Sequence, residues 1–172
     1  MTKGSKAVER FERAAQATGL SFEVLRFPEG TKTAADAARA VGCEVGQIVK
    51  SLVFVADGEP VIALVSGADR LDPGRLAAAL GATAVRRAHG EEARAATGFA
   101  IGGVPPIGHA RALTILMDER LLAHDLVWAA AGLPDAVFKA PPGELQVAAG
   151  ARVAALAATE TDRNQSVAPS HR

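Results

Sequence analysis

The segment from residue 50 to residue 66 constrains the fold more than any other part of the chain. Two runs of apolar and β-branched residues, Lys50–Ala56 and Pro60–Ser66, flank the dipeptide Asp57-Gly58. An Asp-Gly pair between such runs is typical of a two-residue β-hairpin turn, because both residues tolerate a positive φ. Both faces of the first run are apolar apart from Lys50 and Ser51, which is typical of a strand covered on both sides. The sequence therefore predicts a buried hairpin.

Further helices and strands are predicted around this hairpin. N-cap candidates at Thr33 and Asp72, stop glycines at Gly42 and Gly81, and helical spacing of apolar residues mark the helices. The predicted helices cover Lys6–Ala17, Thr33–Val41, Asp72–Leu80, His89–Ala96, Glu144–Val147 and Ala151–Ala158, with a short helical turn at Val45–Val49. The other predicted strands cover Ser21–Phe27, Ala84–Arg87, Thr97–Ile101, Ala112–Met117, Leu126–Ala130 and Ala136–Phe138.

Strands outnumber helices in this pattern, and several neighbouring strands are separated by hairpin-length gaps. The regular alternation of strand and helix that a doubly wound parallel sheet requires is missing. The predicted class is therefore α+β, with a mixed sheet flanked by helices. At 172 residues the chain fits one domain, which we place at residues 1–158. The polar segment 159–172 has no apolar periodicity and is expected to be a disordered tail.

Composition narrows the class of protein. The longest apolar runs are far shorter than the roughly 20 residues of a membrane span, so no membrane partner is expected. The polar start of the chain is unlike a signal sequence and favours a cytoplasmic protein. The single cysteine, Cys43, excludes an internal disulfide and a cysteine-based zinc site. Nineteen basic and nineteen acidic residues balance, so no global field attracts nucleic acid. Residues 86–111 hold arginines that fit either a local basic patch or dispersed solvated charges.

Several common catalytic and cofactor motifs are absent from the sequence. There is no phosphate-binding loop of the G-x-x-x-x-G-K-[ST] type and no G-x-G-x-x-G after a strand. Ser66 lacks the first glycine of a nucleophile elbow. The four histidines never pair at metal-ligand spacing, and His89 fits an exposed helix start. None of these common motifs therefore identifies the chemistry of the chain.

Two features remain that can carry chemistry. Lys50 lies on an otherwise apolar strand, so its side chain either extends to the edge or points into a functional cavity, where it would offer positive charge. The loop Gly102–Gly108 contains three glycines and two prolines, and such a loop can bring backbone N–H groups close to a ligand. It also fits an ordinary wide turn. His109 at its end fits either a ligand donor or a cap of the turn.

Three stretches in this order resemble one family. They are Gln47-Ile48-Val49-Lys50-Ser51-Leu52, then Leu71-Asp72, then Thr97-Gly98-Phe99-Ala100-Ile101-Gly102-Gly103-Val104-Pro105-Pro106-Ile107-Gly108. Over residues 20–155 the chain resembles the YbaK/ProX aminoacyl-tRNA deacylases, which are related to the editing domain inserted in bacterial prolyl-tRNA synthetases. The resemblance implies a barrel-like mixed sheet flanked by helices, without a metal or organic cofactor. It also implies hydrolysis of the ester that joins a wrong amino acid to the 3′-terminal adenosine of tRNA.

The resemblance also implies roles for residues. Lys50 matches the essential lysine of the family, and Gly102 matches the glycine whose backbone lines the aminoacyl site. We expect Lys50 to bind the terminal adenosine or its phosphate and to orient the ester. We expect the amides of Gly102 and Gly103 to hold the ester carbonyl or the amino acid while a water attacks. No residue stands out as a general base. The substrate-binding residues expected from the same motifs are Phe27, Ser51, Ile101, Val104, Pro105, Gly108, His109 and Val137.

The pocket walls bear on specificity. Phe27 falls near a tyrosine of cysteine-specific members, and Val137 falls near an acidic residue of those members. His109 replaces a different polar residue. These departures allow alanyl, seryl or threonyl esters at least as well as cysteinyl esters. Phe27, Ile101, Val104 and Val137 are also compatible with a purely structural role in the core.

Three functions are compatible with the sequence. The first is a trans-editing deacylase that acts on the acceptor end of an aminoacyl-tRNA, alone or with an aminoacyl-tRNA synthetase. The second is a non-catalytic module that binds tRNA or a synthetase. The third is a small-molecule hydrolase or transferase that reuses the cavity. The intact lysine and glycine loop favour the deacylase. Whether the chain forms a homodimer is left open.

Overall fold

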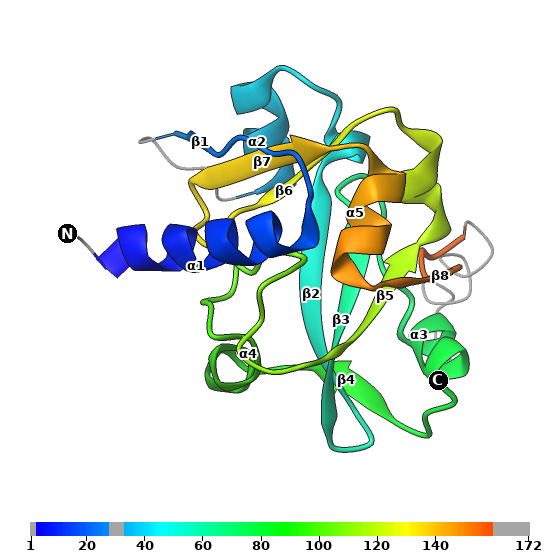
Figure 1. Ribbon diagram of the computed structural model, residues 1–172. Helices are drawn as coiled ribbons and strands as arrows, with labels where there is room; N and C mark the ends of the chain where they lie inside the picture. The colour runs from blue at the N-terminus through cyan, green and yellow to red at the C-terminus, as the bar shows by residue number, and fades with distance from the viewer. Residues whose placement is uncertain (1–2, 28–32, 160–172) are drawn as a thin grey trace.

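The computed structural model describes residues 3–27 and 33–159, which form two open sheets with helices around them (Figure 1). The helices are α1 (Lys3–Thr18), α2 (Ala34–Val41), α3 (Pro73–Leu80), α4 (Gly90–Thr97) and α5 (Pro142–Ala149), with 3-10 turns η1 (Val45–Gln47) and η2 (Glu119–Ala123). The strands are β1 (Leu25–Arg26), β2 (Val49–Ala56), β3 (Glu59–Ser66), β4 (Val85–Arg87), β5 (Thr114–Asp118), β6 (Val127–Ala130), β7 (Ala136–Ala140) and β8 (Arg152–Ala154).

The predicted hairpin forms the centre of the larger sheet. β2 and β3 pair along their whole length, from Val49 opposite Ser66 to Ala56 opposite Glu59. Asp57 and Gly58 have φ values of 48° and 85°, so both turn residues adopt the positive φ that a type I′ turn requires. The sheet runs in the order β4-β2-β3-β5-β8, with β5 and β8 parallel to their neighbours. This mixed arrangement confirms the predicted α+β class.

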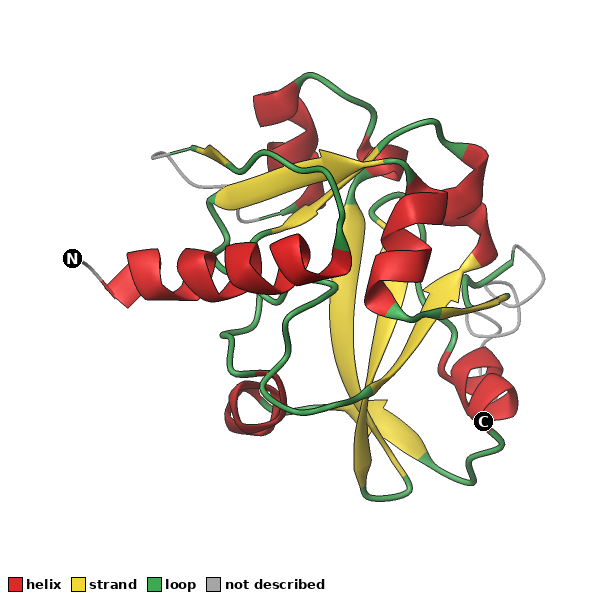
Figure 2. Cartoon of the chain, viewed as in Figure 1, coloured by secondary structure: helices red, strands yellow, loops and turns green. Residues whose placement is uncertain are grey.

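The second sheet has the order β1-β7-β6 and is antiparallel. It meets the larger sheet through an isolated bridge between Ile48 and Trp128. The expectation of a barrel-like sheet is wrong in this respect, because the described strands form two separate open sheets. Among the described strands, β4 pairs with residues 54–56 of β2 and β6 meets the same edge at the Ile48–Trp128 bridge, so the edge of β2 is open between these two contacts. Figure 2 shows the helices arranged outside both sheets.

Capping interactions explain why the helices begin and end where the sequence predicted. The Thr33 hydroxyl accepts a hydrogen bond from Asp36 N, and the Asp36 side chain accepts one from Thr33 N. Asp72 accepts hydrogen bonds from the first turn of α3. Gly42 and Gly81 end α2 and α3 with φ values of 77° and 67°. These local signals are independent of tertiary packing.

Three predicted elements differ in the structure. The strand predicted at Thr97–Ile101 is wrong, because Thr97 ends α4 and Gly98 caps it with φ of 83°. The helix predicted at Ala151–Ala158 is also wrong, because that segment contains β8 beside β5. Asp118 holds the end of the segment extended, since its Oδ1 accepts from the N–H groups of residues 156 and 157. The strand predicted at Ser21–Phe27 pairs only over Leu25–Arg26.

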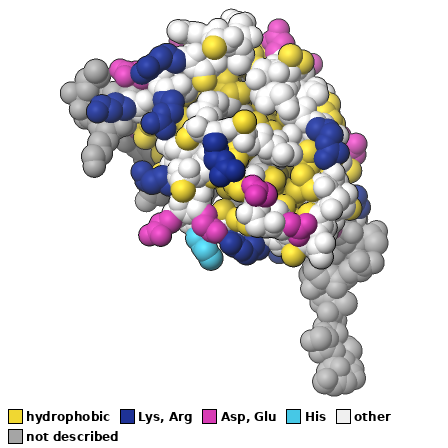
Figure 3. Space-filling view, turned by 60° about the horizontal axis from the view of Figure 1, so that its bottom comes forward, with side chains coloured by type: hydrophobic (Ala, Val, Ile, Leu, Met, Phe, Trp, Pro, Cys, Tyr) yellow, Lys and Arg dark blue, Asp and Glu magenta, His cyan; other side chains and the backbone are white. Residues whose placement is uncertain are grey.

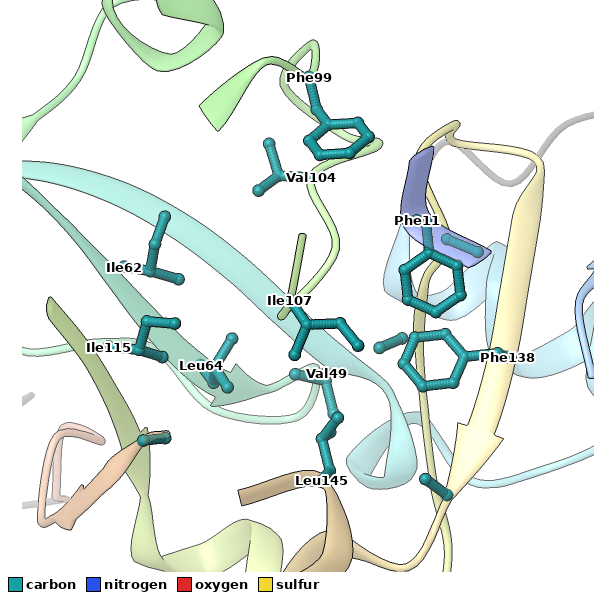
Figure 4. Close-up of a cluster of buried hydrophobic side chains, with 14 of the residues drawn as sticks. Phe11, Val49, Ile62, Leu64, Phe99, Val104, Ile107, Ile115, Phe138 and Leu145 are labelled. Carbon is teal, nitrogen blue, oxygen red and sulfur yellow. The ribbon is translucent and has the colours of Figure 1, made fainter. Parts of the chain in front are cut away.

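The main core lies between the two sheets and under α1. Phe11 of α1 packs against Phe138 of β7, with ring centroids 4.6 Å apart (Figure 4). A second cluster covers the opposite face of the hairpin, where α3 packs. Val49 and Val53 belong to the first cluster, whereas Phe54 and Ala56 belong to the second. The two faces of β2 thus alternate as predicted, and both are buried.

Candidate active site

A cavity of about 340 Å³ opens along the free edge of β2. Its walls come from the first half of β2, the start of α2, Ile101 with Gly102 and Val104 of the glycine loop, and the strands β6 and β7. These segments are far apart in sequence and meet here because the two sheets leave β2 uncovered. Ligand pockets usually measure about 300–1,000 Å³, so this one suits a small group.

The free edge of β2 presents main-chain polar groups on the side of the cavity. Gly67 N donates to Ile48 O at 2.6 Å, and Ala88 N donates to Val53 O at 3.0 Å. The main-chain N–H and C=O groups of successive residues alternate between the two edges of a strand. Those of the even-numbered residues of β2 therefore face β3, and those of the odd-numbered residues face the other edge. Ser51 therefore directs its N–H and C=O to the edge where β4 has already ended.

The side chain of Ser51 is the second unusual feature of this edge. Ser51 lines the cavity, and its Oγ is buried without a hydrogen-bond partner among the described residues. A buried hydroxyl left in this state costs about 1–3 kcal/mol. A folded chain rarely leaves such a group unpaired, so a bound ligand is the natural partner.

Lys50 lies beside Ser51 and also lines the cavity. Its half-buried side chain donates from Nζ to the main-chain oxygen of Asp69 at 2.6 Å. The Asp69 carboxylate in turn pairs with Arg120, with Nη1 to Oδ1 at 3.0 Å. Burial lowers the pKa of the Lys50 amine, the charge of Asp69 raises it, and the charge of Arg87 lowers it further. The sequence left open whether this side chain extends to an edge or points into a cavity. In the structure it lines the cavity, and its amine reaches the turn after β3.

The glycine loop contributes Gly102 to the cavity but not Gly103. Gly102 has φ of 93°, which favours glycine, and its N–H has no partner in the described part of the chain. Gly103 N already donates to Ala100 O at 3.0 Å. A Cβ on Gly103 would lie 2.8 Å from both Gly132 O and Leu133 Cα. The structure thus leaves the Gly102 amide available to a ligand, whereas the Gly103 amide holds the loop together.

The predicted substrate-binding residues divide into two groups. Ser51, Ile101, Val104 and Val137 line the cavity. Four others lie outside its lining: Phe27, Pro105, Gly108 and His109. His109 Nε2 lies 2.7 Å from Pro105 O and donates to it, as expected for a turn cap. Burial lowers the pKa of this imidazole. Gly108 and His109 instead line a separate groove that also contains Ala14 of α1 and Ala149 of α5.

Two residues of the cavity were not predicted from the sequence: Arg87 of β4 and Trp128 of β6. Arg87 places its guanidinium carbon 5.5 Å from the centroid of the Phe54 ring. Trp128 is the only tryptophan of the chain, and that rarity was the one available signal. Neither residue lies near the lysine or glycine motifs in sequence. Only the meeting of β4 and β6 with β2 brings them together.

The surface near the tip of the β2–β3 hairpin carries mixed charge. Arg86 and Glu92 form a two-pronged ion pair with distances of 2.8 and 2.7 Å, and Arg111 lies 3.6 Å from Glu59. Figure 3 shows basic and acidic side chains interspersed on one face. Within residues 3–27 and 33–159, no group of three or more His, Cys, Asp or Glu side chains is placed to hold a metal ion. None of the described helices is long and apolar enough to cross a membrane.

Comparison with known proteins agrees with this geometry. The aminoacyl-tRNA editing domain family matches residues 28–147. The chain is 37% identical to a proline–tRNA ligase of Acidithiobacillus ferrooxidans over 117 residues, 68% of this chain and 20% of the ligase. It is 31% identical to a proline–tRNA ligase of Streptococcus equi over 126 residues, 73% of this chain and 20% of the ligase. The chain therefore spans about a fifth of the length of these relatives.

A solved structure gives a match over nearly the whole chain. It is described as a candidate trans-editing enzyme for prolyl-tRNA synthetase, with 46% identity and a TM-score of 0.85. The match covers 92% of this chain and 99% of that one. Together, the mixed sheet, the cavity beside Lys50 and these matches show that the chain belongs to the aminoacyl-tRNA editing domain family. The resemblance to the YbaK/ProX deacylases is confirmed.

Proposed function

We propose that this protein is a trans-acting deacylase that hydrolyses the ester between a small amino acid and the 3′-terminal ribose of a mischarged tRNA. The amino acids that we expect are alanine, serine, threonine and cysteine. The carrying observation is the cavity at the open edge of β2, where Ser51 Oγ and the Gly102 N–H have no hydrogen-bond partner among the residues that the structure describes. Family membership and the similarity to a candidate trans-editing enzyme support the same conclusion.

The size and walls of the cavity support a small substrate group. A volume of about 340 Å³ is near the lower end of the usual range, about 300–1,000 Å³. It suits an amino acid with part of a ribose, so the rest of the tRNA would remain on the surface. Val104 and Val137 are buried and apolar, which suits a small side chain without charge. Discrimination between such side chains is the task of a second, editing pocket.

The reaction needs few catalytic side chains because an aminoacyl ester is already activated. The oxygen of a water bonds to the ester carbonyl carbon, and negative charge develops on the carbonyl oxygen. The bond from this carbon to the ribose oxygen then breaks. A proton from the water passes to the ribose oxygen, and the products are the free amino acid and a tRNA with its terminal hydroxyl restored. Positioning and charge stabilisation supply the rate enhancement.

The described residues have distinct roles in this proposal. The free N–H of Gly102 donates to the developing oxyanion, and Ser51 Oγ binds a polar group of the aminoacyl ribose. Lys50 binds the terminal adenosine or its phosphate. The hydrogen bond from Lys50 to Asp69 O is made to a neutral carbonyl, whereas a phosphate adds the attraction between opposite charges. A phosphate can therefore replace Asp69 as the partner of this amine.

The proposal also names partners and a compartment. The tRNA acceptor end is the required partner, and an aminoacyl-tRNA synthetase is a second one that would help to select the tRNA. The cytoplasm is the compartment in which such substrates arise. These partners and this compartment follow from the proposed reaction, and they would be rejected together with it.

Deacylation of a panel of tRNAs charged with Ala, Ser, Thr, Cys or Pro tests the function. Wild-type protein is compared with Lys50→Ala and with Lys6→Ala, an exposed lysine on α1 that serves as matched control. We expect the wild type to hydrolyse one or two of the mischarged species. Lys50→Ala should lose this activity while Lys6→Ala retains it, with equal far-UV circular dichroism for all three proteins.

Two outcomes overturn the proposal. If the wild type hydrolyses no species above the spontaneous rate, the deacylase is rejected, and binding of tRNA without turnover would then identify a binding module. If the wild type hydrolyses free amino-acid esters as fast as aminoacyl-tRNA, the protein is a small-molecule hydrolase instead.

A further inference from the structure

Trp128 occupies a position in the cavity to which the proposed reaction assigns no role. Its half-buried side chain lines the cavity and packs against the cluster formed by α2 and Ile48. The main chain around it is fixed, because Ile48 and Trp128 form the bridge between the two sheets. The indole is therefore held in place before any ligand arrives.

Lys139 lies directly across the strand pair from Trp128. The two residues are partners in the β6–β7 register, and Lys139 Nζ lies 5.6 Å from the centroid of the indole. Lys139 is exposed, and within residues 3–27 and 33–159 its side chain has neither an ion pair nor a hydrogen bond. An aromatic ring that lines the cavity and an exposed cation over that ring thus lie together.

We infer that Trp128 is the stacking platform for the 3′-terminal adenine of the tRNA, and that Lys139 binds a further phosphate of the same single-stranded 3′ end, beyond the group bound by Lys50. This inference rests on the proposed function, since it assumes a single-stranded 3′ end at the cavity. Single-stranded nucleic acids bind proteins through bases stacked on aromatic rings and phosphates paired with cations. In the proposed function the cavity holds the aminoacyl group, so the adenine, one ribose away, lies near the cavity wall, of which Trp128 is the aromatic residue.

The strengths of the two contacts with the indole favour replacement of the lysine by the base. A cation over an aromatic ring at an exposed site changes an equilibrium constant by about 2- to 5-fold. A base stacked on an aromatic ring changes it by about 5- to 150-fold. The adenine therefore displaces the Lys139 amine from the ring, and the freed amine can pair with a phosphate.

Intrinsic fluorescence tests the inference without any enzymatic reaction. The chain contains one tryptophan and no tyrosine, so emission excited at long wavelength reports Trp128 alone. The probe is an uncharged tRNA minihelix ending in CCA. Its control is the same minihelix with an abasic last nucleotide. We expect quenching by the CCA minihelix and little change with the abasic one.

Variants test the same inference through the proposed reaction. Trp128→Leu should raise the KM for aminoacyl-tRNA by about 5- to 150-fold with little change of kcat, whereas Trp128→Phe keeps an aromatic face and should raise it less. Leu126→Ala, a partly exposed apolar residue just before β6, is the matched control. Lys139→Gln should reduce the slope of log Kd against log salt by about 0.7, as expected for one phosphate contact.

The outcomes separate this inference from the proposed function. If deacylation is intact but the CCA minihelix leaves the fluorescence unchanged at saturating concentration, the stacking platform is rejected and the deacylase stands. Quenching by the CCA minihelix in a protein without deacylase activity supports the platform and rejects the deacylase. Equal quenching by the abasic minihelix rejects the platform, as does a KM that Trp128→Leu and Leu126→Ala alter equally.

Discussion

The Nζ atom of Lys50 donates a 2.6 Å hydrogen bond to the main-chain oxygen of Asp69, and the Asp69 carboxylate is paired with Arg120. The lysine is thus tied to the turn that follows β3, its hairpin partner. The hairpin places the two residues close together because Lys50 pairs with Val65, four residues before Asp69. One local element therefore fixes the position of the positive charge at the cavity.

Arg87→Gln should raise the pKa of Lys50. Burial lowers the pKa of this amine most, and the positive charge of Arg87 lowers it further, so removal of that charge moves the pKa upward. The titration is measured by NMR of the protein with 13C-methylated lysines, of which the chain has five. Arg94→Gln on α4 is the control, and an equal effect of both variants would contradict the assigned cause.

Ser51→Ala should leave the free energy of unfolding unchanged or raise it, because the hydroxyl it removes has no partner. The same change should lower kcat/KM for deacylation by about 3- to 10-fold, the effect of one lost hydrogen bond. Ser66→Ala is the matched control, since Ser66 Oγ donates to Gly46 O at 2.8 Å and should be needed for stability. Thermal unfolding measures the stability of both variants. A similar loss of Tm in the two variants would reject the ligand-binding role of Ser51.

Gly103→Ala should destabilise the protein more than Gly102→Ala. A Cβ on Gly103 meets backbone atoms of Gly132 and Leu133 at 2.8 Å, and neither can move without the loop. A Cβ on Gly102 meets the Pro134 side chain at ordinary contact distance, with Cγ at 3.6 Å and Cβ at 4.0 Å, so the penalty there comes from φ of 93°. Strain of that kind costs about 1–3 kcal/mol. Urea unfolding measures both changes, and the reverse order would show that the loop packs differently.

Glu92→Gln should reduce stability at neutral pH but not in acid. Its pKa is lowered from 4.5 to about 2, chiefly by the hydrogen bond from Arg86 and also by the N–H of His89. A carboxylate with a lowered pKa stabilises the fold above its unfolded pKa, and this contribution is lost as the pH falls from about 4.5 to about 2. The difference in urea midpoint between wild type and variant should therefore shrink between pH 7 and pH 3. High salt should shrink it too, because the pair is exposed.

Glu91→Gln provides the control for this pair. Glu91 is the neighbouring exposed carboxylate on α4 and lies outside the ion pair. Its substitution should change the urea midpoint less than Glu92→Gln does at pH 7. An equal effect would assign the stability to the general charge of the helix start, which favours anions, and not to Arg86.

Local signals in the sequence predicted much of the fold. The turn at Asp57-Gly58 and the caps at Thr33 and Asp72 depend on the conformations of a few neighbouring residues, and the structure has all three. The segment Thr97–Ile101 misled the prediction. The Thr97 hydroxyl bonds to Ala93 O and accepts from Phe99 N, so the apolar residues after it leave the helix as a loop.

The sequence also predicted part of the candidate site. Ser51, Gly102 and Val137 line the cavity with Lys50, as the family resemblance implied. His109 was expected to bind the substrate, and the structure places it outside the cavity lining because the loop turns its ring toward Pro105 O. The direction of a side chain from an irregular loop depends on contacts that no periodicity encodes.

The sequence by itself determined the hairpin, the capped helices and the presence of one lysine on an apolar strand. These features follow from φ preferences and from the period of apolar residues, which act over a few neighbours. Only the tertiary structure decided that β4 ends before it reaches Ser51 and that Trp128 closes the cavity wall. Those relationships depend on which strands lie side by side, and the packing of residues distant in sequence sets that order.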